Sequence, residues 1–150
     1  MTASTELLIG DADGQHVLVR AEARHHPHLF DSSAGNWISS EVDIAAGGMR
    51  ATFRAELKSE EFQAFLDEVD ALTRTLDGVA TFSTTEGQLT VSLTGDPSGQ
   101  VRVAGEAVDA PGSGNRLYFG FEVDQRRLPQ ISQSLQLLLS AFPVVGVADA

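Results

Sequence analysis

The sequence contains no cysteine, so neither a disulfide framework nor a thiolate nucleophile or metal ligand is available to it. It also lacks an uninterrupted run of about 18 apolar residues, the length that a membrane-spanning helix needs. No basic segment followed by an apolar one opens the chain, as a secretory leader would. We therefore expect a cytoplasmic protein without a membrane partner.

Basic residues are scarce. Ten Lys and Arg stand against 21 Asp and Glu, which gives a formal net charge of −11 at pH 7. A surface of this sign repels the phosphates of nucleic acids and anionic membranes over a Debye length of about 10 Å. We therefore expect no nucleic-acid partner. Two interpretations of the charge remain, namely solubility and the electrostatic steering of a basic partner.

Glycine-containing turn dipeptides divide the chain into short segments of alternating polarity, which is the pattern of β-hairpins. The dipeptides are Asp13-Gly14, Gly47-Gly48, Glu86-Gly87, Ser98-Gly99 and Ser113-Gly114. The alternation places one apolar face on each predicted strand. These faces comprise Val17, Val19, Ala21 and Ala23; Met49, Ala51, Phe53, Ala55 and Leu57; Leu89, Val91 and Leu93; and Leu117, Phe119, Phe121 and Val123.

Two segments have helical periodicity instead. The first follows Ser59, a predicted N-cap, and ends near Asp77-Gly78. The second extends from about Arg127 to Phe142 and is followed by Pro143. Their apolar stripes are Phe62, Phe65, Leu66, Val69, Leu72 and Leu76 in the first and Leu128, Ile131, Leu135, Leu138 and Phe142 in the second.

The strand and helix around residues 48–72 match those around residues 114–138 after a shift of 66 residues. The matched pairs are Gly48/Gly114, Arg50/Arg116, Phe53/Phe119, Glu56/Glu122, Phe62/Leu128, Phe65/Ile131, Val69/Leu135 and Leu72/Leu138. An internal duplication explains the matches, and so does the shared periodicity of a strand followed by an amphipathic helix. In both cases we expect a single domain over residues 1–150. Its predicted class is α+β and mainly β, an antiparallel sheet or partly open barrel of about eight strands covered by two helices.

Three of the four histidines and the only tryptophan lie close together, at His25, His26, His28 and Trp37. The three imidazoles are too near one another, in a segment that contains proline, to converge on one tetrahedral ion without further ligands. We therefore expect an exposed loop and no metal. His16 is predicted to be exposed on its strand without a partner, and Trp37 to be substantially buried.

Motifs of catalysis are missing as well. Residues 10–15, "GDADGQ", begin like a calcium loop but lack its later acidic ligand. Residues 111–117, "PGSGNRL", precede a predicted strand and not a helix, which excludes a phosphate-binding loop. There is no Gly-x-Ser-x-Gly element, and the hydroxyl side chains have no evident base. We expect neither an enzyme nor a cofactor.

Several short motifs follow one another over most of the chain. They are Gly35-Asn36-Trp37, Gly47-Gly48, Phe53 and Ala55, Gly95-Asp96, Gly114-Asn115, Asp124-Gln125 and Leu128-Pro129. In this order and spacing, the segment from Gly35 to Gly146 resembles the bacterial WapI-type immunity protein family. Where we expect an acidic and aromatic stretch before Gly-Asn-Trp, this chain has "HPHLFDSSA", which retains only Asp31.

The resemblance implies a small, non-catalytic cytoplasmic protein that binds and neutralises the nuclease domain of a contact-dependent toxin, in that family a nuclease that acts on transfer RNA. A nuclease must present Lys and Arg to RNA phosphates, so an acidic protein can cover the same surface. We expect the contact on the solvent face of the first helix. The predicted partner-binding residues are Glu60, Glu61, Asp67, Glu68 and Asp70.

Two other functions stay open. A small-ligand-binding β domain would use Arg50, Arg54, Arg116 and Tyr118 to hold an anionic ligand. Ion pairs with Glu56 and Glu122 on an exposed strand face explain the same arginines. A dimerising structural protein would use the second helix, which has no charged residue between Leu128 and Phe142 and is therefore expected to be buried or paired. The sequence leaves the oligomeric state open.

Overall fold

The computed structural model describes residues 5–31 and 34–146. The elements are β1 (Glu6–Gly10), β2 (His16–Arg24), β3 (Trp37–Ala46), β4 (Met49–Lys58), α1 (Ser59–Thr75), β5 (Val79–Ser83), β6 (Leu89–Gly95), β7 (Gln100–Val108), β8 (Arg116–Asp124) and α2 (Leu128–Ala141). A 3-10 turn, Gln125–Arg127, precedes α2. Across these described ranges, neither helix combines the length and the apolarity that crossing a bilayer requires.

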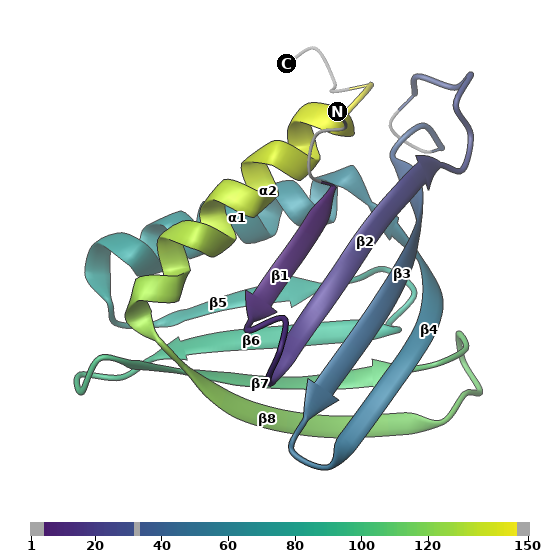
Figure 1. Cartoon of the computed structure of the whole chain (residues 1–150). Coiled ribbons are helices and arrows are strands. Elements are labelled where there is room, and N and C mark those ends of the chain that lie inside the picture. Colours follow the sequence, from purple (N-terminus) through teal and green to yellow (C-terminus); the bar gives the residue numbers. More distant parts are fainter. Residues whose placement is uncertain (1–4, 32–33, 147–150) are drawn as a thin grey trace.

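The strands form two antiparallel sheets of four strands each, in the orders β1-β2-β3-β4 and β5-β6-β7-β8. The sheets face each other with their strands crossing, and the two helices lie side by side at one side of them (Figure 1). Helix α1 packs on the edge strand β5 and α2 packs on the edge strand β1. The helices, which pack on each other, thus connect the β1 edge of one sheet to the β5 edge of the other. The predicted antiparallel α+β fold is confirmed, in the form of two sheets and not of a closed barrel.

Each half of the chain contains four antiparallel strands followed by one helix. The 66-residue shift carries β4 onto β8 and α1 onto the turn and α2. The first strands of the two halves, β1 and β5, begin 73 residues apart instead, at Glu6 and Val79. The repeat is therefore present in the topology, while the shift of 66 residues holds only for the last strand and the helix.

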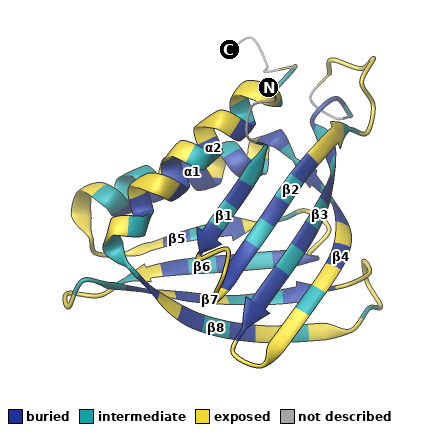
Figure 2. Cartoon of the chain, viewed as in Figure 1, coloured by how far each residue is buried: buried dark blue, intermediate teal, exposed yellow. Residues whose placement is uncertain are grey.

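The predicted apolar faces of the strands point into one core, which Figure 2 shows as the dark inner faces of both sheets. Two residues depart from this pattern. Ala23 is exposed because the β2–β3 register shifts between Ala21 and Ala23, which turns the side chain outward. Met49 is 58% exposed because it stands at the tip of the β3–β4 hairpin.

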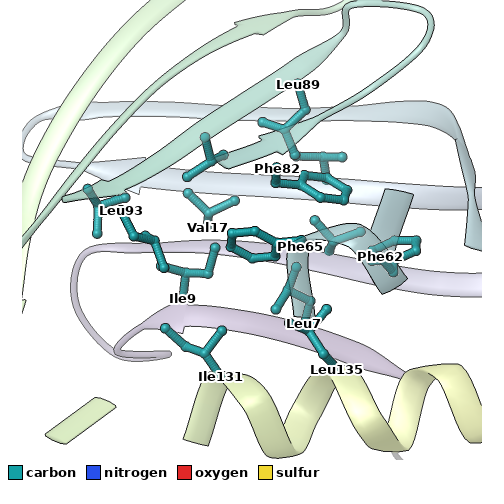
Figure 3. Close-up of a cluster of buried hydrophobic side chains, with 14 of the residues drawn as sticks. Leu7, Ile9, Val17, Phe62, Phe65, Phe82, Leu89, Leu93, Ile131 and Leu135 are labelled. Atoms are coloured by element: carbon teal, nitrogen blue, oxygen red, sulfur yellow. The ribbon is translucent and has the colours of Figure 1, made fainter. Parts of the chain in front are cut away.

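The centre of the core joins both helices to both sheets (Figure 3). Phe62 and Phe65 of α1 pack against Phe82 of β5, with ring centroids 5.1 and 5.4 Å from that of Phe82. Ile131 and Leu135 of α2 point into the same cluster. The helical spacing thus predicted the buried faces correctly, except for Leu76, which caps the end of α1 and is 38% exposed.

The first helix begins slightly earlier than the sequence suggests and ends close to Asp77, as predicted. Ser59 is its first residue, and the predicted N-cap is wrong, because Lys58 holds the cap position in an extended conformation. The Glu61 carboxylate accepts a hydrogen bond of 2.8 Å from the Lys58 backbone N–H, which satisfies one of the free donors there. At the other end Leu76 adopts a left-handed φ of 55°, so the helix stops before Asp77.

His16 is buried, with 4% of its surface exposed, which overturns the prediction of an exposed ring without a partner. Its Nδ1 lies 3.1 Å from the carbonyl oxygen of Asp11 and 3.0 Å from that of Gly14, within the β1–β2 turn. Two acceptors require a proton on Nδ1. Its Nε2 lies 3.5 Å from Oδ2 of Asp43 on β3. The ring therefore fastens the β1–β2 turn to the start of β2.

Candidate partner-binding site

The five acidic residues predicted to bind a partner lie on α1, but their surroundings differ. Glu60, Asp67 and Glu68 are exposed, while Glu61 and Asp70 are half-buried. Asp67 accepts a hydrogen bond of 3.1 Å from Gln63 on the same helix. Within residues 5–31 and 34–146, the side-chain carboxylate of Glu60 forms neither a hydrogen bond nor an ion pair. Within the described ranges, Glu60 and Asp67 are thus the carboxylates of the set that form no hydrogen bond or ion pair with another element.

The other three carboxylates hold neighbouring elements in place. Glu61 accepts two hydrogen bonds of 2.7 Å from Thr85, one from its N–H and one from its hydroxyl. Glu68 accepts a 2.9 Å bond from the N–H of Thr81 on β5. Because β5 is an edge strand, this bond occupies a backbone donor that would otherwise be open to a further strand. Asp70 accepts a 2.6 Å bond from the Ser132 hydroxyl and joins α1 to α2.

Trp37 is partly buried, so the prediction of a substantially buried indole is met in part. The alternation of β3 places Ile38 inside and Trp37 on the outer face of the sheet. Strand pairing sets Trp37 opposite Lys58, whose Nζ lies 4.8 Å from the indole ring centroid. On the other side, the His25 N–H donates a 2.9 Å hydrogen bond to the carbonyl oxygen of Trp37.

A hollow of about 320 Å³ opens beside the indole. It is lined by His25, His26, Trp37, Glu56 and Glu86. The loop after β2 supplies the histidines, β3 the indole, β4 one carboxylate and the β5–β6 turn the other. His25 Nδ1 lies 3.3 Å from Oε1 of Glu56, and the His25 and His26 rings meet edge to face. We refer to these five residues as the Trp37 hollow.

Sequence reasoning singled out the histidines and the tryptophan of the Trp37 hollow but missed its two carboxylates. Within the histidine segment itself, the acidic residue is Asp31. Glu56 reaches His25 through the pairing of three strands, and Glu86 belongs to the other sheet. No local pattern in the sequence predicts that Glu56 or Glu86 lies beside the histidines and Trp37.

The histidine segment is a surface loop, as predicted, and His25, His26 and His28 are all exposed. In the part of the chain that the structure describes, no three His, Asp or Glu side chains are grouped so that they could hold a metal ion. His25 and Glu56 form a close imidazole–carboxylate contact. This arrangement suits a polar contact surface better than a metal centre.

The four residues proposed as hooks for an anionic ligand do not converge. Arg50 and Arg116 line a cavity of about 260 Å³ between β4 and the β7–β8 hairpin. Arg54 pairs with Glu22 at 2.7 Å, and a hydrogen bond from Arg54 lowers the pKa of the Glu22 carboxyl. Within the described ranges, Tyr118 lies outside the lining of this cavity.

Arg54 and Arg116 form ion pairs, as predicted, but the predicted partners Glu56 and Glu122 are wrong. Within residues 5–31 and 34–146, Arg50 forms no ion pair. Glu22 takes Arg54, and Glu106 lies 3.1 Å from Arg116. Glu106 is the cross-strand neighbour of Tyr118. A hydrogen bond from Tyr118 and the charge of Arg116 lower the pKa of the Glu106 carboxyl.

The motifs that carried the family resemblance are structural in this chain. A Cβ on Gly35 would lie 2.5 Å from the Leu29 carbonyl oxygen, so only glycine fits. The adjacent Asn36 is fully buried and hydrogen-bonded to the C-terminal segment. A Cβ on Gly114 would lie 2.2 Å from Oδ1 of Asp109, and that oxygen accepts the N–H of Asn115 at 2.7 Å.

Comparison with solved structures returns distant likenesses. Trypanosoma bruciei MRP1/MRP2 is 10% identical with a TM-score of 0.46, over 91% of this chain and 83% of that chain. A CdiA-CT/CdiI toxin and immunity complex from Enterobacter cloacae is 11% identical with a TM-score of 0.42, over 66% of this chain and 88% of that chain. At these identities and TM-scores neither likeness bears on function. No curated protein matches the chain.

The comparison with protein families identifies the family of this chain, because the match covers most of the sequence. The sequence pattern of the immunity protein WapI-like family matches residues 7–143, from β1 to the end of α2. The match therefore includes both sheets, both helices and the Gly-Asn-Trp and Gly-Asn motifs whose tight packing the structure explains. This chain belongs to the WapI-like immunity protein family.

Proposed function

We propose that this protein binds a basic toxin domain in the cytoplasm and neutralises it without catalysing a reaction. The observation that carries the proposal is the membership of nearly the whole chain in the WapI-like immunity protein family. The net charge of −11 supports it, because opposite charge accelerates the encounter with a basic partner.

We further propose that the toxin is a nuclease and that the acidic face of α1 covers its phosphate-binding surface. Glu60, Asp67 and Glu68 point outward on this face. Glu61 and Asp70 add negative charge, while their oxygens hold Thr85 and Ser132. A carboxylate surface on a rigid helix mimics the phosphates that such a nuclease binds. Covering that surface is enough to exclude the substrate.

The test is co-expression with the basic domain encoded next to this protein's gene. We expect a stable complex, loss of the domain's cleavage of transfer RNA, and association that slows steeply as salt is raised. Reversing Glu60 and Asp67 to Lys should slow association without unfolding, since both side chains are exposed and neither contacts another element. A matched reversal of Asp13 and Glu122, two exposed residues off α1, is the control.

Two results would contradict the proposal. A domain that remains fully active in the presence of this protein would show that neutralisation does not occur. Equal association of the parent and the Glu60 and Asp67 variant would remove α1 from the interface and leave the acidity with its solubilising role.

A second function is favoured by the cavity between β4 and the β7–β8 hairpin. Two arginines, Arg50 and Arg116, line its approximately 260 Å³. That volume suits a small anion, although pockets for drug-sized ligands are larger, at about 300–1,000 Å³. A melting temperature that rises with a small phosphorylated or carboxylated compound, and no longer does so in Arg50→Ala, would support this alternative.

A further inference from the structure

The Trp37 hollow has the composition of a receptor for a cationic side chain. Its lining supplies one indole, two imidazoles and two carboxylates, and neither Lys nor Arg. The indole of Trp37 is half-buried, so part of its surface is open to a partner. Partly open Trp residues in pockets are typical of the few positions that dominate binding energy.

The carboxylates of the Trp37 hollow have acceptor capacity left. Oε1 of Glu56 is engaged, at 3.3 Å from His25 Nδ1 and 3.2 Å from the Ser39 hydroxyl. Its Oε2 accepts no hydrogen bond within residues 5–31 and 34–146, and over the same residues Glu86 forms neither a hydrogen bond nor an ion pair. Three oxygens at the hollow are thus available for an incoming donor.

The indole already carries a cation on part of its surface. Lys58, the only lysine of the chain, has its Nζ 4.8 Å from the Trp37 ring centroid. That distance is within the range in which the ring quadrupole attracts a cation. Lys58 does not line the hollow, so the surface of the indole that faces the hollow remains open.

The Trp37 hollow adjoins the acidic face of α1. Glu86 follows Thr85, and Glu61 in the first turn of α1 binds both donors of Thr85 at 2.7 Å. The exposed Glu60 lies in the same turn. A basic protein that covers this end of α1 therefore reaches the hollow as well.

We infer that the Trp37 hollow receives one arginine side chain of the basic partner, with its guanidinium against the indole and paired with Glu56 and Glu86. This inference rests on the proposed function. Arginine fits better than lysine because a planar guanidinium stacks on an aromatic face and donates to two carboxylates from one fixed fork. An ammonium is a single, strongly hydrated point charge.

The test uses octa-arginine and octa-lysine peptides as probes. Because Trp37 is the only tryptophan, its emission reports on the hollow directly. We expect octa-arginine to change this emission saturably and to bind more tightly than octa-lysine. The double variant Glu56→Gln/Glu86→Gln should weaken octa-arginine binding about tenfold, since it removes two partly exposed ion pairs.

A matched control removes the same charge elsewhere. Asp13→Asn/Glu122→Gln changes two exposed carboxylates away from the hollow and should leave octa-arginine binding within about twofold. Equal weakening in both double variants would mean that overall charge binds the peptide, and would overturn the inference. So would an unchanged Trp37 emission, or equal binding of the two peptides. Thermal melting of each variant confirms that it is folded.

The co-expressed toxin domain separates this inference from the proposed function. If the parent neutralises the domain and the Glu56→Gln/Glu86→Gln variant neutralises it equally well, the inference is wrong and the proposed function stands. If the parent does not bind the domain, yet octa-arginine shows the expected pattern, the proposed function is wrong and the arginine preference of the hollow is supported.

Discussion

Asn36 and Val145, 109 residues apart, exchange two hydrogen bonds. The Asn36 side-chain amide donates to the Val145 carbonyl oxygen at 3.0 Å, and the Val145 N–H donates to Asn36 Oδ1 at 2.7 Å. The backbone of Asn36 also accepts the N–H of Ser59 at 2.9 Å. One buried side chain therefore joins the segment after α2 to the loop before β3, next to the start of α1.

Replacing Asn36 with Ala should lower the free energy of unfolding by about 2 kcal/mol, because two hydrogen bonds are lost and the groups of Val145 lose their partner. Urea unfolding followed by circular dichroism measures the change. Gln133→Ala removes an exposed amide of α2 and should change the value by less than about 0.5 kcal/mol. Equal effects of the two substitutions would show that the Asn36 bridge contributes nothing.

His16→Ala should destabilise the protein by about 1–3 kcal/mol, because a buried ring that fastens the β1–β2 turn is removed. The same urea experiment measures it. The control is the simultaneous change of His25, His26 and His28 to Gln, which alters exposed residues only and should leave the melting temperature nearly unchanged. A larger loss in the triple variant than in His16→Ala would refute this assignment of roles.

Glu61 and its neighbour Glu60 differ in structural role. Glu61→Ala should cost about 2 kcal/mol of stability, since Thr85 and the start of α1 lose their acceptor. Glu60→Ala should cost less than about 0.5 kcal/mol, because this exposed residue contacts no other element. Hydrogen exchange of the Thr85 N–H should accelerate in Glu61→Ala alone. Unchanged protection of that amide would contradict the role of Glu61.

Phe65→Ala should cost about 3–5 kcal/mol, because this fully buried ring contacts Phe82 at the centre of the core and its loss leaves a cavity. Leu137→Ala offers a comparison on α2, where the side chain is 40% exposed and a smaller loss is expected. Thermal and urea unfolding of both variants check the difference. A cost below that of Leu137→Ala would be inconsistent with the described core.

The pH dependence of stability should include a contribution from Asp109. Hydrogen bonds from the side chain and backbone of Asn115 hold the pKa of this carboxyl below its ordinary value of 3.8. A lowered pKa in the folded state stabilises the protein above the ordinary pKa, and this stabilisation is lost as the pH falls through the lowered value. Asp109→Asn should therefore be less stable than the parent at about pH 6, and the difference should shrink as the pH falls below the ordinary pKa of 3.8. A difference independent of pH would contradict the linkage.

Local periodicity was sufficient to predict both helices, the strands β2, β4, β6 and β8, and most of the face that each of them buries. The alternation along β6 and β8 and the stripe of Phe62, Phe65 and Val69 reflect a backbone repeat of two or 3.6 residues, which acts over a few neighbours. The bulge near Ala23 and the N-cap of α1 escaped prediction, because strand register and helix ends depend on contacts with other elements.

The functional surface depends on sequence-distant contacts instead. The acidic spacing on α1 was evident, yet three of its five carboxylates accept hydrogen bonds from other elements. Their donors are Thr81 on β5, Thr85 in the turn after β5 and Ser132 on α2. Trp37 is only partly buried because the alternation of β3 places it on the outer face of the sheet. Glu56 and Glu86 line the same hollow as Trp37 for two reasons. The β2–β3–β4 register positions Glu56, and the packing of the second sheet against the first positions Glu86. The sequence by itself determines the residue types and their local spacing. Which of these residues meet at one surface is decided by the packing of the two sheets and the helices.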